Sequence, residues 1–342
     1  MSELIKLLGG TATAWPLAVR AQTAQPVVGY LAQGSPEGTA DTVQLRAVVV
    51  EYRWAEGRND KFPALLADLI GRQVAVIVAP TTPAVLAAKT ATNTIPIVFF
   101  TAGDPVDLGL VTNLNLPDRN LTGATTLTLE VGPKWLQLLH DTVPSATSLA
   151  LLINPTSPNL AETQARDMQA AAHASGLQLH VLRASTVADL DTVFASIAQL
   201  GAGGLVISSD SFFFGQSKQL ATLAVRHAVP TIFGFREFVT AGGLMSYGGS
   251  LTESFRWVGI YTGQILKGAK PADLPVQRST KIELFINLQT AQALGIESAA
   301  HATYPRRGCY RMNWLDVRFW HKADITTVFQ RCLLLSEKRT SG

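Results

Sequence analysis

The sequence has very few of the residues from which thiol enzymes and metal sites are built. Of 342 residues, only 2 are Cys and 6 are His. Both cysteines, Cys309 and Cys332, lie close to the C-terminus, and the histidines share no metal-ligand spacing. We therefore predict that residues 22–295 hold no catalytic thiol, no metal cluster and no disulfide framework.

Charge and long apolar runs are also scarce. Only 15% of the residues are charged, and the formal net charge is +3. The excess of Lys and Arg lies in residues 296–342, whereas residues 22–295 are close to neutral. This distribution argues against a basic groove on the folded body, so we expect no nucleic-acid partner. No segment beyond the N-terminus offers the roughly 18 uncharged apolar residues that a membrane helix needs.

Short motifs of enzyme chemistry are missing as well. The chain contains no Walker A motif, no G-x-S-x-G and no H-E-x-x-H, and its first predicted strand ends in Ala32-Gln33-Gly34-Ser35 in place of a G-x-G-x-x-G loop. The sequence therefore predicts a binding protein that has no catalytic residues and no cofactor, and an enzyme of the two-domain α/β kind is a weaker alternative.

The N-terminus has the pattern of an export signal. A short apolar run, residues 4–17, follows Lys6 and leads to Val19-Arg20-Ala21, where small residues stand at the two positions that a signal peptidase reads. We predict a signal peptide over residues 1–21 and cleavage after Ala21. The alternative is an uncleaved N-terminal segment of a cytosolic protein.

The rest of the chain alternates between strand-like and helix-like segments, which is typical of parallel sheets covered by helices. The length suits two domains of roughly 100 to 150 residues. The strand-like runs fall into two sets of four, at 27–32, 47–54, 74–79 and 95–100, and then at 149–153, 177–182, 204–208 and 229–235. The sequence thus predicts an α/β fold with two Rossmann-like lobes.

The two sets of strands match in detail. The first strand of each set runs into a polar loop that ends in Ser-Pro, and the fourth begins with an aliphatic residue and Pro, as in Ile95-Pro96 and Val229-Pro230. Between its first and second strands, the second set has room for a full helix, whereas the first set has only residues 37–46. We therefore predict a shortened first helix in the first lobe.

Residues 94–123 contain both a cleft wall and a connection. The run 95–100 predicts a buried strand, and it ends in a small polar loop of the kind that binds ligands in open α/β sheets. Residues 115–123 are rich in Asn, Pro, Asp and Gly, which indicates a crossing between lobes. We predict that lobe 1 holds 22–122 with about 244–272, that lobe 2 holds 123–243 with about 273–295, and that 296–342 form an atypical tail.

The predicted strand ends carry polar and aromatic side chains that suit a recognition cleft. Thr82 precedes Pro83, which predicts a helix N-cap whose free amides would suit a carboxylate. Acidic side chains at other strand ends could oppose an ammonium group, and an aromatic pair could cover an apolar group. The acidic residues are Asp104, Asp210 and Glu237, and the pair is Phe212 and Phe213. Alternatively, Thr82 is a cap alone, Asp104 braces a turn, and the aromatic pair belongs to the core.

Several long stretches resemble one protein family. They include LLGGTATAWPLAVRAQ, VVGYLAQGSPEG, TIPIVFFTAGDPVDLGLVTNLNLPDRNLTG and REFVTAGGLMSYGGSLTESFRWVGIYTGQILKGAKPADLPVQ. The sequence resembles the periplasmic substrate-binding proteins of bacterial ABC transporters, in the tryptophan- and branched-chain-amino-acid-type branch with the type I fold. The resemblance implies two lobes joined by a hinge, a small amino-acid-like ligand in the cleft between them, and a membrane permease as partner. The ligand contacts that it implies are Ser35, Thr82, Asp104, Asn154, Asp210, Glu237 and Tyr247.

The chain departs from this family pattern at three places. Met1-Ser2-Glu3-Leu4-Ile5-Lys6 stands where relatives usually carry a twin-arginine motif, so we expect a periplasmic protein whose signal lacks that motif. The first helix is shorter than in relatives, and the tail after residue 295 resembles unrelated sequence. The main alternative function is a cytosolic effector-binding sensor or regulator of the same fold.

Overall fold

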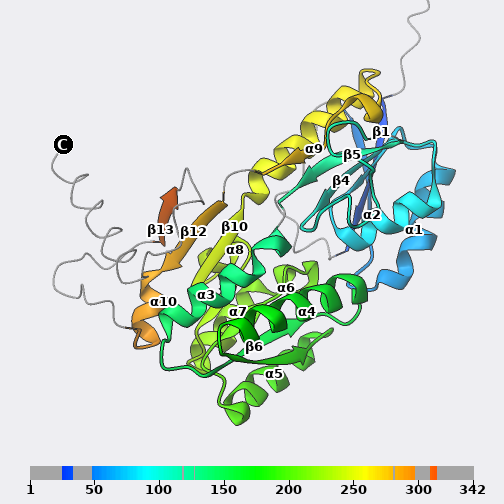
Figure 1. Ribbon diagram of the computed structural model, residues 1–342. Coiled ribbons are helices and arrows are strands. Elements are labelled where there is room, and N and C mark those ends of the chain that lie inside the picture. The colour runs from blue at the N-terminus through cyan, green and yellow to red at the C-terminus, as the bar shows by residue number, and fades with distance from the viewer. Residues whose placement is uncertain are drawn as a thin grey trace, which may run out of the picture.

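Two β-sheets, each flanked by helices, make up the two lobes of the protein (Figure 1). The computed structural model describes residues 25–33, 48–117, 119–126, 128–279, 282–296 and 309–313. The first sheet has the strand order β11-β5-β4-β3-β1-β2, and the second has the order β13-β12-β10-β9-β8-β6-β7. The predicted two-lobe α/β fold is therefore confirmed. The predicted signal peptide and the predicted short helix at 37–46 lie outside the described residues.

The first lobe is built mainly from the N-terminal part of the chain. Its strands are β1 (Val27–Ala32), β2 (Val49–Trp54), β3 (Val76–Ala79), β4 (Ile97–Thr101), β5 (Leu121–Thr125) and β11 (Gln277–Arg278). Its helical segments are η2 (Asn59–Lys61), α1 (Phe62–Gly71), α2 (Thr82–Ala91), α9 (Leu251–Leu266) and η4 (Pro271–Asp273). Every residue of β3 and β4 is buried, which explains why these strands are continuous aliphatic and aromatic runs.

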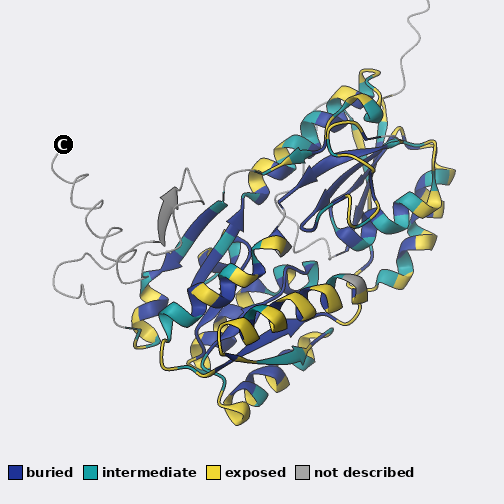
Figure 2. Ribbon diagram, in the orientation of Figure 1, coloured by how far each residue is buried: buried dark blue, intermediate teal, exposed yellow. Residues whose placement is uncertain are grey.

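The second lobe takes up the middle of the chain and part of its C-terminal region. Its strands are β6 (Ser148–Ile153), β7 (Gln178–Arg183), β8 (Leu205–Ile207), β9 (Thr231–Phe233), β10 (Met245–Gly249), β12 (Ile282–Asn287) and β13 (Cys309–Asn313). Its helical segments are η3 (Thr128–Val131), α3 (Gly132–Thr142), α4 (Pro158–Ala174), α5 (Val187–Leu200), α6 (Ser211–Gly215), α7 (Ser217–Arg226), α8 (Arg236–Thr240) and α10 (Leu288–Ala293). Figure 2 shows buried strands beneath helices whose outer faces are exposed.

Strand β5 corrects the predicted position of the first crossing. It pairs in parallel with β4 along its whole length, so residues 121–123 belong to the first sheet and do not connect the lobes. At Gly123 the fold leaves no room for a side chain. A Cβ on Gly123 would lie 2.1 Å from the Phe99 carbonyl oxygen, and Thr122 Oγ1 donates to Leu274 O at 2.7 Å. The chain leaves the first sheet only after Thr125.

Two strands of the C-terminal region belong to a different lobe from the one predicted. Strand β10 pairs with β9 and β12 in the second sheet, although residues 244–272 were assigned to the first lobe. Strand β11 pairs with β5 in the first sheet, although residues 273–295 were assigned to the second. Helix α9 does pack on the first lobe, against β3, β4 and β5. Apolar patterning identified these elements, but it carries no information on which sheet edge each one joins.

Within the described residues, the chain therefore crosses between the lobes three times, and the crossings meet at small residues. They lie after β5, between β10 and α9, and between β11 and β12. A Cβ on Gly249 would lie 3.1 Å from both Thr126 Cβ and Ser279 Oγ. The Ser279 amide also donates to Thr125 O at 2.9 Å. Three connections packed side by side, with glycine at their contact, form a junction about which two lobes can rotate.

Further features of the described residues bear on the predictions. The tail supplies β13, whose backbone pairs antiparallel with β12 at the edge of the second sheet, and the remainder of residues 297–342 lies outside the description. Among the described helices, none combines the length and hydrophobicity needed to span a membrane. No group of His, Cys, Asp and Glu in the described ranges is arranged to hold a metal ion.

Candidate functional site

A cavity of about 560 Å³ lies where the strand ends of the two lobes face each other. From the first lobe it is lined by the ends of β1, β3 and β4, the start of α2, and α9. From the second lobe it is lined by the loops after β7, β8 and β9 and by α6. This is the place at which open α/β sheets bind ligands, because the carboxyl ends of the strands leave a crevice there.

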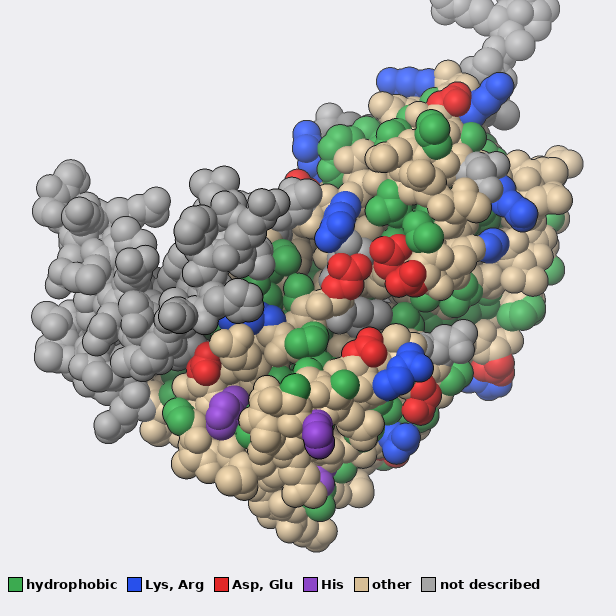
Figure 3. Space-filling model, viewed as in Figure 1, with side chains coloured by type: hydrophobic (Ala, Val, Ile, Leu, Met, Phe, Trp, Pro, Cys, Tyr) green, Lys and Arg blue, Asp and Glu red, His purple; other side chains and the backbone are tan. Residues whose placement is uncertain are grey.

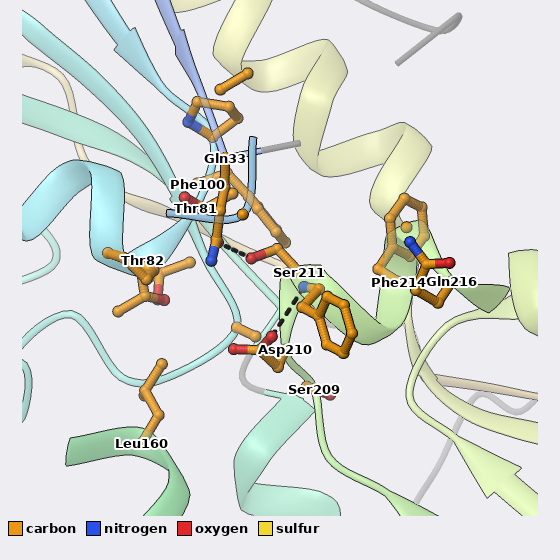
Figure 4. Close-up of a pocket in the computed structure, with 18 of the residues that line it drawn as sticks. Gln33, Thr81, Thr82, Phe100, Leu160, Ser209, Asp210, Ser211, Phe214 and Gln216 are labelled. Carbon is orange, nitrogen blue, oxygen red and sulfur yellow. Dashed lines mark hydrogen bonds between the residues drawn. The ribbon is translucent and has the colours of Figure 1, made fainter. Parts of the chain in front are cut away.

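The most deeply buried acidic side chain of the cavity is Asp210, at the N-cap of α6. It is 8% exposed, and its carboxylate accepts hydrogen bonds from the Phe212 amide at 2.8 Å, Asn154 Nδ2 at 2.8 Å and Ser157 Oγ at 3.1 Å. Burial raises the pKa of Asp210, and the three donors oppose that rise. The result is a buried negative charge held in a fixed orientation at the cavity wall (Figure 4).

Other charged side chains lie at the cavity rim and are already paired. Glu56 accepts from Lys61 at 2.6 Å, and Arg58 contacts Asp60 at 2.6 Å in an exposed ion pair. Among the described residues that line the cavity, Asp210 is therefore the charged side chain that is buried. Among the described lining residues, a ligand that reaches the interior therefore meets a buried negative charge, while the cationic Arg58 lies at the exposed rim in an ion pair with Asp60.

The start of helix α2 forms the opposite polar wall. The N-cap is Thr81, whose Oγ1 accepts from the Ala84 amide at 3.4 Å, so the predicted N-cap Thr82 is wrong by one position. Thr81 has the extended backbone of a cap, whereas Thr82 is the first helical residue and bonds the buried Thr101 hydroxyl at 2.7 Å. Thr82 still lines the cavity. The positive end of the helix dipole consequently faces the interior.

Phenylalanine side chains form the apolar wall. Phe100 of β4 and Phe255 of α9 lie 5.2 Å apart between ring centroids, and Phe214 of α6 packs edge-on against Phe235 at 5.9 Å. All four line the cavity together with Phe212, whereas Phe213 is fully buried in the core. Of the aromatic pair that the sequence suggested, one residue thus faces the cavity and one does not.

Two buried polar atoms in the cavity lining have no hydrogen-bond partner among the described residues. They are Gln33 Nε2, at the end of β1, and Ser209 Oγ, in the loop after β8. Buried polar groups in folded proteins are normally satisfied. Two such groups in one cavity are expected if the cavity binds a polar ligand that supplies their hydrogen-bond partners.

Only part of the predicted set of site residues lines this cavity. Thr82 and Asp210 do, and Asn154 lies just behind Asp210, where it also accepts from the Thr156 amide at 3.0 Å. The structure does not place Asp104, Glu237 or Tyr247 among the lining residues. Ser35 lies outside the described residues.

The residues away from the cavity have structural roles. Asp104 Oδ1 accepts from the Val106 amide at 2.7 Å and braces a turn, which was the alternative interpretation. Its charge also helps to raise the pKa of Glu130, for which burial is the main cause.

Figure 3 shows acidic side chains gathered near the middle of one face. Glu237 lies 3.7 Å from Arg236 at the start of α8, and the Tyr247 carbonyl accepts from Trp135 Nε1.

Three residues that line the cavity were not among the predicted contacts: Phe255 of α9, Phe100 of β4 and Gln33 after β1. Phe255 was assigned to a helix of apolar spacing, with no indication of which face would meet the cavity. Phe100 was recognised as the last residue of a buried strand, and that position was the available signal, because strand ends face the crevice. Gln33 lies two residues before the predicted contact Ser35, in the loop that the sequence did identify.

Comparison with known proteins agrees with this architecture. A family described as ABC transporter substrate binding protein matches residues 25–302. A tyrosine-binding protein from Clostridioides difficile is 22% identical over 251 residues, which cover 73% of this chain and 71% of the relative. A solved structure of a conserved domain protein from Vibrio cholerae has a TM-score of 0.69 at 23% identity, with 80% of this chain and 95% of that chain covered.

A second solved structure is an ABC domain from Streptococcus pneumonia in complex with L-Trp. Its TM-score is 0.67 at 21% identity, with 80% of this chain and 95% of that chain covered. These structures share the two-lobe fold, and the family match extends over most of the chain. The chain belongs to the family of ABC transporter substrate-binding proteins, which bind solutes and are not enzymes.

Proposed function

We propose that this protein is the solute receptor of an ABC importer and that it captures a small amino-acid-like ligand in the cavity between its lobes. The observation that carries the proposal is the combination of three features around one cavity. These are the buried carboxylate of Asp210, the start of helix α2, and the wall of phenylalanine rings. A zwitterion with an apolar side chain is complementary to all three.

In the proposed arrangement, the ligand ammonium group faces Asp210 and its carboxylate faces the positive end of the helix dipole at the start of α2. The helix dipole supplies the positive potential that a carboxylate needs, so no Arg or Lys is required in the interior. The ligand side chain lies among Phe100, Phe214 and Phe255, where a ring gains both area burial and edge-to-face contacts. The tyrosine and tryptophan bound by two similar proteins support an aromatic ligand.

The partner that follows from this role is a membrane permease, to which the closed and loaded receptor delivers its ligand. The family is one of extracytoplasmic receptors, which supports export and a location in the periplasm. The predicted signal over residues 1–21 would provide that export, and it remains a prediction from the sequence.

A thermal-shift screen tests the ligand class. We expect L-tryptophan, L-tyrosine or L-phenylalanine to raise the melting temperature, because a ligand that binds only the folded state stabilises it by about 2.7 kcal/mol at a hundredfold excess over Kd. The matched controls are D-ribose and L-glutamate, which lack an apolar group and which we expect to leave the melting temperature unchanged. A shift by these controls alone would overturn the proposal of an amino acid with an apolar side chain.

Ligand affinity should fall as the pH is lowered from neutral. Because burial raises the pKa of Asp210, its carboxylate gains a proton at a higher pH than exposed carboxylates do. The protonated form cannot attract an ammonium group, so affinity decreases as the pH falls through that raised pKa. Titration calorimetry of wild type and of Asp210→Asn from pH 7 to pH 4 checks this. The variant should bind weakly with little pH dependence, and an equal pH dependence in both proteins would exclude Asp210 as the titrating group.

A further inference from the structure

A buried amide at the end of β1 has unused hydrogen-bonding capacity. Gln33 is 3% exposed and lines the cavity. Its backbone is fixed by the Gly57 amide, which donates to the Gln33 carbonyl at 2.7 Å. Its side-chain Oε1 accepts from Ser211 Oγ, whereas Nε2 is buried without a partner among the described residues (Figure 4). One amide therefore contacts the opposite lobe and also presents a donor at the cavity.

The bond between Gln33 and Ser211 exists only when the lobes are close together. Gln33 belongs to the first lobe, and Ser211 is the first residue of α6 in the second lobe, directly after Asp210. A second bond across the lobes, from Asn59 Nδ2 to Thr156 O at 3.1 Å, shows that the structure has the lobes in contact. Of these two bonds, the one made by Gln33 involves residues that line the cavity.

Closure changes the surroundings of Gln33 Nε2. When the lobes are apart, water can accept from this nitrogen. When they are in contact, as in this structure, the nitrogen is buried without a partner among the described residues, and burial of an unsatisfied donor is unfavourable. A ligand oxygen at this position would remove the penalty while Oε1 keeps its bond to Ser211.

We propose that Gln33 couples ligand recognition to lobe closure. Its Nε2 donates to an oxygen of the ligand, and its Oε1 holds Ser211 of the opposite lobe, so that full closure is favourable only over a ligand that offers an oxygen acceptor. This inference rests on the proposed function and narrows the ligand class. An aromatic amine without a carboxylate would fill the apolar wall but would leave Gln33 unsatisfied.

The first measurement needs no ligand. Gln33→Met keeps the length of the side chain and removes both the donor that closure would bury and the acceptor for Ser211, whose separate effect is measured with Ser211→Ala. Because a buried unsatisfied donor costs more than one hydrogen bond contributes, the ligand-free variant should populate the closed form more than wild type. Small-angle scattering should then give a smaller radius of gyration. The matched control is Gln164→Met, because Gln164 on α4 also has a buried, unpartnered Nε2 within the described chain but does not line the cavity. We expect this control to scatter like wild type.

The second measurement uses L-tryptophan and tryptamine as probes, since tryptamine keeps the ammonium group and the indole but has no oxygen. Gln33→Met should bind L-tryptophan about tenfold more weakly than wild type. It should bind tryptamine no more weakly than wild type does, because tryptamine leaves Gln33 Nε2 unsatisfied in wild type. Ser211→Ala, at a half-buried hydroxyl, removes only the contact between lobes. It should weaken L-tryptophan binding by a smaller factor and leave the ligand-free radius of gyration no smaller than that of wild type.

The two measurements separate this inference from the proposed function. If Gln33→Met and Gln164→Met both scatter like wild type, Gln33 does not control closure and the inference is wrong. If neither probe nor any other amino acid binds wild type but Gln33→Met is more compact, the closure role stands and the amino-acid ligand is wrong. Equal losses of affinity for both probes would assign Gln33 a packing role and overturn the inference. If Gln33→Met fails to fold, Ser211→Ala decides: unchanged L-tryptophan affinity would contradict the coupling.

Discussion

Replacement of Asp210 by Ala is expected to weaken binding of the amino-acid ligand by about thirtyfold to a few thousandfold. The substitution removes the buried charge proposed to face the ligand ammonium group, and it leaves three donors, Asn154 Nδ2, Ser157 Oγ and the Phe212 amide, without their acceptor. Truncation of one partner in a buried, hydrogen-bonded charge pair costs about 2–5 kcal/mol, and each 1.4 kcal/mol is about tenfold in affinity. Titration calorimetry with the best ligand from the thermal-shift screen measures the loss.

A second acidic residue provides the control for this experiment. Asp104 also follows a buried strand of an α/β sheet, but it braces a turn away from the cavity lining. Asp104→Ala should therefore lower stability slightly and leave ligand affinity within a few-fold of wild type. If Asp210→Ala binds as tightly as Asp104→Ala, the ammonium group does not face Asp210 and the proposed ligand orientation is wrong.

Replacement of Trp135 by Ala is expected to lower the free energy of unfolding by about 3–5 kcal/mol. Trp135 on α3 is 0% exposed, and its Nε1 donates to the Tyr247 carbonyl of β10 at 2.7 Å. A Cβ on Gly234 would lie 3.0 Å from Trp135 Cζ2, so the indole is packed directly against the backbone after β9. The substitution leaves both a large cavity and a buried carbonyl without its donor.

Urea unfolding followed by circular dichroism measures this loss. Trp257→Ala is the matched control, because Trp257 on α9 is only half-buried and its ring packs against Tyr261 at 5.7 Å. We expect the control to lose clearly less stability. Equal losses for the two variants would mean that the link from α3 to β10 adds nothing beyond the burial of an aromatic ring.

The sequence predicted those parts of the fold that depend on local sequence patterns alone. Strands β1, β3, β4 and β6 are apolar runs buried on both faces, and such runs are visible without a structure. Strand β5 was missed because its five residues, Leu-Thr-Gly-Ala-Thr, resemble a linker in composition. Gly123 is required by the close approach of the Phe99 backbone, which is a tertiary contact that composition does not report.

The same distinction applies to the candidate site. Asp210 and Thr82 could be predicted because each follows a strand and lies at a helix start, and both positions are defined by local sequence. Asp104 satisfied the same rule but turns its carboxylate back to its own loop. Phe255 could not be assigned to the cavity, because its position depends on how α9 packs across β3, β4 and β5 after the chain has returned from the other lobe.

The return of α9 and β11 to the first lobe has a consequence for the order of folding. Strands β1 to β5 come first in the chain, yet the helix that packs on β3, β4 and β5 and the strand that pairs with β5 come after β10. The first lobe therefore cannot complete its sheet until residues 251–278 have been synthesised and a long loop has closed. Contacts of such large sequence separation slow folding. Strands β6 to β10 of the second lobe are consecutive in sequence, so this lobe can form its central sheet first. It would then bring β5, which precedes β6, close to α9 and β11, which follow β10 and complete the first lobe.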